Sequence, residues 1–115
     1  PAASSQPFSG ELRAALDCLE HCGDWLRQQA AANPAEVGAA AVDYLQLFGY
    51  VAYAYMWARM AAVAQANRGA DEAFYAAKLA TAQFYFRKLL PRIHSLEASI
   101  RAGSAPLYGL DDAQF

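Results

Sequence analysis

An all-α fold, an antiparallel up-and-down bundle of three long helices, is what this sequence predicts. Three long stretches carry apolar residues at three- and four-residue steps. No stretch of useful length alternates between apolar and polar residues as a β-strand does. Helix-stop signals at Asn33-Pro34 and Arg68-Gly69 separate the stretches by short links, so neighbouring helices should run antiparallel. Pro91 falls inside the third stretch and should kink it or split it, which would give four helices.

The first predicted helix begins near Ser9, a suitable N-cap, with Glu11 in the first turn, where the helix dipole favours an acid. Its apolar stripe is broadened by Leu16 and Trp25 and consists of Leu12, Ala15, Leu19, Cys22 and Leu26. The helix should end at Asn33, because the residue before a proline avoids the helical region.

The second predicted helix begins with an Asn-x-x-Glu capping box, in which Asn33 is the N-cap, Pro34 the first helical residue and Glu36 the reciprocal partner. It should run to about Asn67. Between residues 39 and 66 the clearly polar residues are only Asp43, Gln46, Arg59 and Gln65. A helix that is apolar nearly all round must be buried on more than one side.

The third predicted helix begins near Asp71-Glu72 and ends at Arg101 and Gly103. An i,i+4 pair of Glu97 and Arg101 supports its last turns. A heptad-like seam runs through it, formed by Tyr75, Leu79, Ala82, Phe86, Leu89, Ile93, Leu96 and Ile100.

These signals divide the chain into a linker at residues 1–8, a helical bundle domain at 9–103 and a C-terminal tail at 104–115. The tail contains Pro106 and Gly109 and is expected to pack irregularly across the bundle. The linker-like start indicates a piece of a longer protein.

Composition excludes several classes of function. The net charge of −2 gives no electrostatic support for binding nucleic acid. The most apolar stretch, residues 47–58, is shorter than the roughly 20 residues of a spanning helix, so we expect no membrane span. No signal peptide is visible, and Cys18 and Cys22 are expected to stay reduced in the cytoplasm.

No constellation of residues predicts catalysis, cofactor binding or a metal site. Cys18 and Cys22 share a helix face, but His21 lies about 100° away, and a structural zinc site needs four converging ligands. Buried thiols on a core face are the simpler interpretation. His94 has no nucleophile or second base at a telling spacing.

Two groups of residues are candidates for binding. On the second helix, Tyr50, Tyr53, Trp57 and Met60 continue a face begun by Asp43 and Gln46, and they are of the types enriched at protein interfaces. Another side carries Leu45, Phe48, Ala52 and Tyr55, so one set can serve the core while the other meets a partner. Burial of both faces within the domain and a small ligand cleft remain alternatives.

The second group, Arg87, Lys88 and Arg92, is a candidate contact for a phosphate or coenzyme A, with surface salt bridging as the alternative.

Several of these segments resemble a known family. They are Tyr44-Leu-Gln-Leu-Phe-Gly49, Trp57-Ala-Arg-Met-Ala61, Phe74-Tyr-Ala-Ala-Lys78, Phe84-Tyr-Phe86, Leu90-Pro91 and Ile100-Arg-Ala-Gly103. From about Phe8 onward the chain is similar to the additional C-terminal helical domain of the large acyl-CoA dehydrogenases.

The resemblance implies a parent flavoprotein that oxidises acyl-CoA to 2-enoyl-CoA with FAD in fatty-acid β-oxidation. Its glutamate base and cofactor site would lie in preceding domains, so no catalytic residue is carried onto this chain. The domain would pack on those catalytic domains or on another subunit of a homo-oligomer such as a dimer, or shape the active-site entrance. The alternative is a free-standing helical protein-interaction module.

Overall fold

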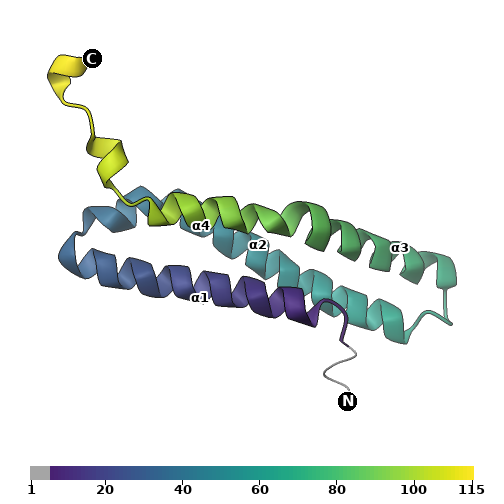
Figure 1. The fold of residues 1–115 in the computed structure, drawn as a ribbon. Coiled ribbons are helices and arrows are strands. Elements are labelled where there is room, and N and C mark those ends of the chain that lie inside the picture. The colour runs from purple at the N-terminus through teal and green to yellow at the C-terminus, as the bar shows by residue number, and fades with distance from the viewer. Residues whose placement is uncertain (1–5) are drawn as a thin grey trace.

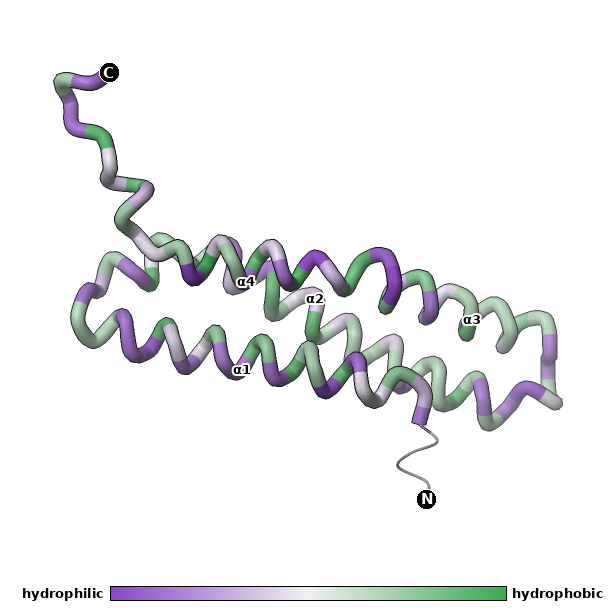
Figure 2. Tube along the Cα trace, in the orientation of Figure 1, coloured by the Kyte–Doolittle hydropathy of each residue, from purple (hydrophilic) through white to green (hydrophobic). Residues whose placement is uncertain are grey.

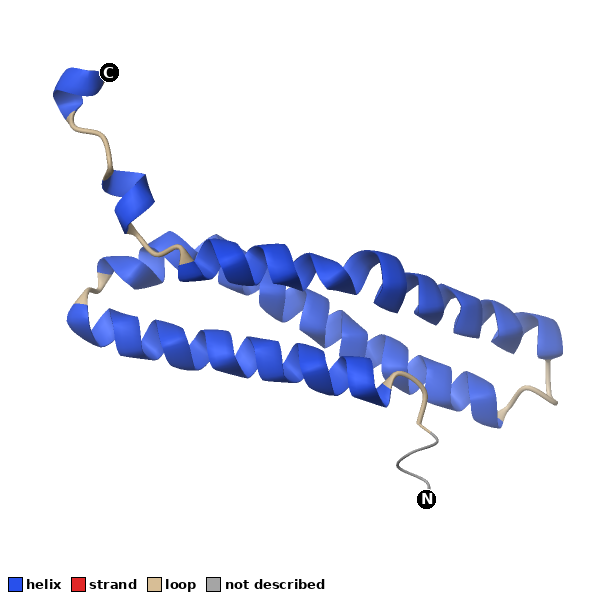
Figure 3. Ribbon diagram, in the orientation of Figure 1, coloured by secondary structure: helices blue, strands red, loops and turns tan. Residues whose placement is uncertain are grey.

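Helix α2 (Ala35–Ala66) lies at the centre of the fold and packs along each of the other long helices. The computed structural model describes residues 6–115. Figure 1 shows α1 (Ser9–Ala32) running antiparallel to α2, and α3 (Glu72–Phe84) and α4 (Ile93–Arg101) following each other along its other side. The predicted all-α bundle is confirmed, and Figure 3 shows no strand in the described part of the chain.

The link between α1 and α2 forms largely as predicted. Asn33 has extended dihedral angles that end α1, and its Oδ1 accepts a hydrogen bond from the Ala35 N–H at 3.1 Å. The predicted capping box itself does not form, because the Asn33 side chain bonds the N–H of Ala35 and not that of Glu36, and the Asn33 N–H donates to the carbonyl of Gln29 at 2.9 Å. The Glu36 carboxylate instead accepts from the backbone N–H and the hydroxyl of Ser104, at 3.0 and 2.7 Å.

The start of α1 differs from the prediction. Ser9 is the first helical residue, and the preceding Phe8 has a left-handed φ of 62° with no side-chain cap. The Phe8 carbonyl accepts a hydrogen bond from the Leu12 N–H at 2.9 Å. The Phe8 ring stacks on the Phe86 ring, with the two ring centroids 4.4 Å apart. Phe8 therefore packs with the bundle and is not part of a linker. Residues 1–5 of the predicted linker lie outside the described residues.

Helix α2 ends at Ala66, one residue before the predicted end. The Asn67 side-chain amide donates to the Val63 carbonyl at 2.7 Å, so asparagine provides the polar group at this terminus. Helix α3 begins at Glu72, close to the predicted start, and Asp71 caps it, because its carboxylate accepts from the Phe74 N–H at 3.1 Å.

Pro91 changes the pitch of the third helix without breaking it. A π-helical turn spans Tyr85–Leu89, a 3-10 turn spans Leu90–Arg92, and α4 follows directly. A proline has no N–H to donate, and in an α-helix its ring clashes with the carbonyl four residues earlier. The π turn before the proline, in which the Leu90 N–H donates to the Tyr85 carbonyl, is wider than an α-helical turn, and the helix continues beyond Pro91 to Arg101.

The predicted seam of the third helix faces the core, and all eight of its residues are buried or half-buried. The π turn adds a residue to one turn, so Tyr85 and Leu90 are buried as well, although the heptad spacing omits them. The facing stripe of α2 is fully buried and consists of Ala40, Leu47, Val51, Ala54, Ala61 and Ala64. Its small alanines allow the helices to approach closely.

The C-terminal tail does not pack on the bundle, contrary to the prediction. Gly103 turns the chain with a φ of +78°, and Ser104 is held by Glu36. Residues 105–115 are all exposed and leave the end of the bundle as two short 3-10 turns, Ala105–Tyr108 and Asp112–Gln114 (Figure 1). Because the exit point is fixed at the bundle end, the tail points away from the apolar surfaces.

Within residues 6–115, no helix combines the length and apolar character needed to cross a membrane.

The Glu36–Ser104 contact joins the start of α2 to the end of α4, and its loss should weaken the fold. Replacing Glu36→Ala leaves the partly buried Ser104 N–H and hydroxyl without their acceptor, which should lower the free energy of unfolding by about 1–3 kcal/mol in urea denaturation. Glu36→Gln keeps one acceptor oxygen and should lose less. Glu20→Ala, at an exposed site on α1, is the control, and an equal loss there would contradict this role for Glu36.

Candidate functional site

The side of α2 that points away from the bundle is apolar and exposed. We call it the outer face, and it consists of Val42, Leu45, Phe48, Tyr53, Met56, Met60 and Val63, each between 38% and 70% exposed. Figure 2 shows that α2 is green or pale along most of its length, whereas α1 alternates between purple and green. A monomeric domain rarely exposes a large apolar surface along a helix, so this face is the candidate binding site of the chain.

Two grooves flank the outer face. One, of about 530 Å³, lies between α2 and α3 and is lined by Met56, Arg59, Met60, Val63, Ala64, Phe74, Tyr75 and Lys78. The other, of about 340 Å³, lies between α1 and α2 and is lined by Leu16, Leu19, Phe48, Val51, Ala52, Tyr53, Tyr55 and Met56. Met56 lines both grooves, so it sits on the ridge between them. A ridge between two apolar grooves is the shape that packed helices present to one another.

Two cations line the groove between α2 and α3. Arg59 donates to the Tyr55 hydroxyl at 3.3 Å, and the Lys78 ammonium lies 5.3 Å from the centre of the Phe74 ring. Both cations lie near aromatic rings, and the other residues that line this groove are apolar or aromatic. The outer face therefore has an apolar centre and a partly charged rim, which is also the usual anatomy of a protein interface.

Two of the four predicted interface residues lie on this surface, and the other two lie at its edge. Tyr53 and Met60 belong to the outer face, whereas Tyr50 and Trp57 are half-buried against the core. The other predicted set is exposed at Leu45, Phe48, Ala52 and Tyr55. The residues that sequence reasoning missed are Val42, Met56 and Val63. No signal in the sequence separates them from the inward stripe, because apolar residues occur on nearly every side of this helix.

Tyr50 is held at the edge by contacts with the third helix. Its backbone carbonyl accepts a hydrogen bond from the Tyr85 hydroxyl, and its own hydroxyl accepts from Arg92 at 3.4 Å. Burial, followed by the nearby Tyr50 and Tyr53, raises the pKa of Tyr85 to about 12. Tyr85 therefore remains a hydrogen-bond donor at physiological pH.

The three predicted anion-binding residues do not converge. Arg87 reaches α1 and pairs with Glu11 at 2.9 Å, whereas Arg92 reaches Tyr50 on α2. A backbone hydrogen bond at the start of α1, followed by the bond from Arg87, lowers the pKa of Glu11. Lys88 is exposed between them. An anion contact at this cluster stays a prediction.

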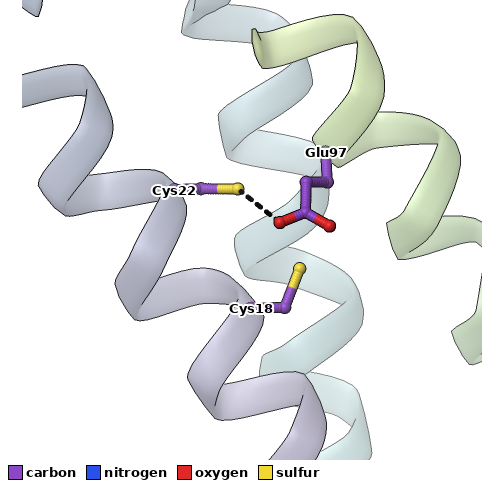
Figure 4. A group of neighbouring side chains, drawn as sticks. All are labelled: Cys18, Cys22 and Glu97. Atoms are coloured by element: carbon purple, nitrogen blue, oxygen red, sulfur yellow. Dashed lines mark hydrogen bonds between the residues drawn. The ribbon is translucent and has the colours of Figure 1, made fainter.

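A cluster of two thiols and a carboxylate lies between α1 and α4. Figure 4 shows the Cys18 and Cys22 side chains directed toward Glu97, and the Cys22 thiol donates to Glu97 Oε2 at 3.9 Å. Burial, followed by the Glu97 charge, raises the pKa of Cys18 to about 12 and raises that of Cys22. Both cysteines are free, as predicted, but sequence reasoning did not identify Glu97 as their neighbour.

The two histidines lie outside this cluster. His21 is exposed on α1, and His94 is exposed at a small pocket that it shares with Glu11, Phe86 and Pro91.

Comparison with known proteins gives one family. Residues 2–111 match the family model described as "acetyl-CoA dehydrogenase C-terminal like". The match includes every helix of the bundle. No curated protein matches the chain.

The two sides of α2 should respond differently to the same substitution. Leu47→Ala removes a fully buried side chain and should lower the free energy of unfolding by about 2–5 kcal/mol. Leu45→Ala, at a residue that is 70% exposed, should change it by no more than about 0.5 kcal/mol. Chemical denaturation followed by circular dichroism measures both. A large loss for Leu45→Ala would show that the outer face stabilises the isolated fold.

Proposed function

This chain belongs to the acetyl-CoA dehydrogenase C-terminal-like family, and from that premise we propose that it is the non-catalytic helical domain of an FAD-dependent acyl-CoA dehydrogenase. In this proposal the outer face of α2 docks on the preceding catalytic domains of the same polypeptide. The domain then stabilises the enzyme and helps to shape its active-site entrance. The observation that carries the proposal is an apolar face that runs the length of α2 and that the bundle itself leaves uncovered.

The choice of docking partner follows from the family description and from the shape of the surface. A domain described as C-terminal is joined to the domains before it, and covalent attachment raises their effective concentration. The grooves on either side of Met56 suit helices as the docked elements. Covering one exposed Leu, Phe or Met side chain stabilises by about 1.5–3 kcal/mol, so a few such contacts hold a tethered domain in place.

The reaction itself would belong to the preceding domains. There, a glutamate base would take the α-proton of the acyl-CoA, and bound FAD would supply the redox chemistry. This is the step expected in fatty-acid β-oxidation, in a cytoplasmic homo-oligomer such as a dimer. In this proposal the chain contributes no catalytic side chain, and its role is packing, subunit contact or shaping of the entrance.

The full-length protein that carries this domain should bind FAD and oxidise acyl-CoA thioesters, whereas the isolated domain should do neither. Flavin absorbance of the purified protein and reduction of an electron acceptor with acyl-CoAs of several chain lengths measure these properties. A correctly folded full-length protein that contains no flavin and is inert on every thioester would exclude the proposal.

Making the outer face polar should weaken the full-length enzyme more than the isolated domain. The triple variant Leu45→Gln, Met56→Gln and Val63→Gln removes apolar contacts that exist only when the domain is docked. Each substitution should cost about 1–2 kcal/mol of docking free energy, because the corresponding apolar burial is lost. The expected result is a lower melting temperature and weaker flavin retention in the full-length protein, with helicity of the isolated domain retained.

The control for this experiment is the pair Glu20→Gln and Gln28→Ala, two exposed polar sites on α1. It should leave the full-length enzyme unchanged. If the triple variant matches this control in the full-length protein but abolishes self-association of the isolated chain in light scattering, the face serves a free-standing interaction module.

A further inference from the structure

The cluster between α1 and α4 brings together three atoms that are typical metal ligands. The Sγ atoms of Cys18 and Cys22 and a carboxylate oxygen of Glu97 all lie within 4.8 Å of one another. The two cysteines are one helical turn apart on α1, and the carboxylate approaches from α4 across the interface (Figure 4). Cys22 is fully buried, and Cys18 and Glu97 are half-buried, so the group lies at the edge of the core with access from one side.

The spacing of these atoms fits a tetrahedral ion. Zinc binds thiolate sulfur at about 2.3 Å and carboxylate oxygen at about 2.0–2.2 Å, which separates the ligand atoms by roughly 3.6–3.8 Å in a tetrahedral site. The distance of 3.9 Å from Cys22 Sγ to Glu97 Oε2 is already close to this value, and a bound ion would draw the Cys18 thiol inward by side-chain rotation. Sulfur ligands select zinc and other thiophilic ions over magnesium or calcium.

The charges also balance when an ion of charge +2 is present. Two thiolates and one carboxylate carry three negative charges, a divalent ion supplies two positive charges, and Arg101 supplies the third. Arg101 is already in place, because its Nε lies 3.5 Å from Glu97 Oε2 and its guanidinium lies over the Trp25 ring at 6.0 Å. It would keep its contact with the carboxylate and orient it toward the ion.

We propose that Cys18, Cys22 and Glu97 form a binding site for a thiophilic divalent cation of the zinc class, with a water molecule as the fourth ligand. Binding forms two metal–sulfur bonds and one metal–oxygen bond and releases the two thiol protons to solvent. The ion links α1 to α4, and its binding therefore stabilises the bundle. The site lies on other residues than the outer face of α2 and does not depend on the proposed docking.

Cobalt titration of the whole protein tests the site. The protein is reduced, stripped of metal with a chelator and titrated with Co²⁺, whose thiolate complexes show charge-transfer and tetrahedral d–d absorption. We expect saturation at one ion per chain, displacement of the cobalt by Zn²⁺, and a zinc-dependent rise in melting temperature.

The variants decide which residues are ligands. Cys18→Ser and Cys22→Ser should each lower the affinity by more than roughly 100-fold, because even the outer partners of metal ligands contribute 10–100-fold. Glu97→Gln retains both thiols and should weaken binding while preserving the charge-transfer band. His21→Ala is the matched control, since His21 is exposed beside Cys22 and is not part of the cluster.

Several outcomes would overturn the proposal. They are the absence of a thiolate band at stoichiometric cobalt, an equal zinc-dependent rise in melting temperature in Cys18→Ser, and loss of binding in His21→Ala with full binding in Glu97→Gln. If a cysteine variant loses its helicity, the Glu97→Gln and His21→Ala pair decides the question in folded protein.

Discussion

A helix that is apolar on every side must have every side covered, and α2 imposes this constraint on the whole structure. Its stripe of leucine, valine and alanine is covered by α1 on one flank and by α3 and α4 on the other, and these contacts form the core. The remaining side of α2, its outer face, has no helix of the bundle against it and stays exposed. The fold and the proposed docking therefore have the same physical cause, which is the uniform hydrophobicity of one long helix.

The segment from α3 to α4 extends along α2 as one helix only because the chain tolerates Pro91. The π turn before the proline and the 3-10 turn around it absorb the missing N–H and the ring, so one continuous helix presents its seam from Tyr75 to Ile100. The same turns set the rotation of α4 about its axis. That rotation brings Glu97 to the two thiols on α1 and Ser104 to Glu36 at the start of α2.

Several polar side chains stabilise the fold within the described part of the chain. Asp71 caps α3, Glu36 holds the end of α4, and Arg87 joins the third helix to Glu11. The thiol–carboxylate cluster differs from these, because burial beside Glu97 makes the thiolate form unfavourable unless a cation joins it. The proposed docking and the proposed metal binding would thus involve separate residues and separate forces, apolar burial on α2 and coordination between α1 and α4.

The amino-acid sequence by itself determined the all-α class, the helix boundaries at Asn33-Pro34, Asp71 and Gly103, and the seam of the third helix, since capping and periodicity act within a turn or two of the chain. Only the tertiary structure decided which side of α2 faces inward, because hydrophobicity spread around a helix carries no direction. It also decided that Glu36 binds Ser104 instead of completing its capping box, that Glu97 meets the thiols, and that the tail leaves the bundle. Each of these depends on the rotation and register of one helix against another, which is set by side-chain packing between segments far apart in the chain.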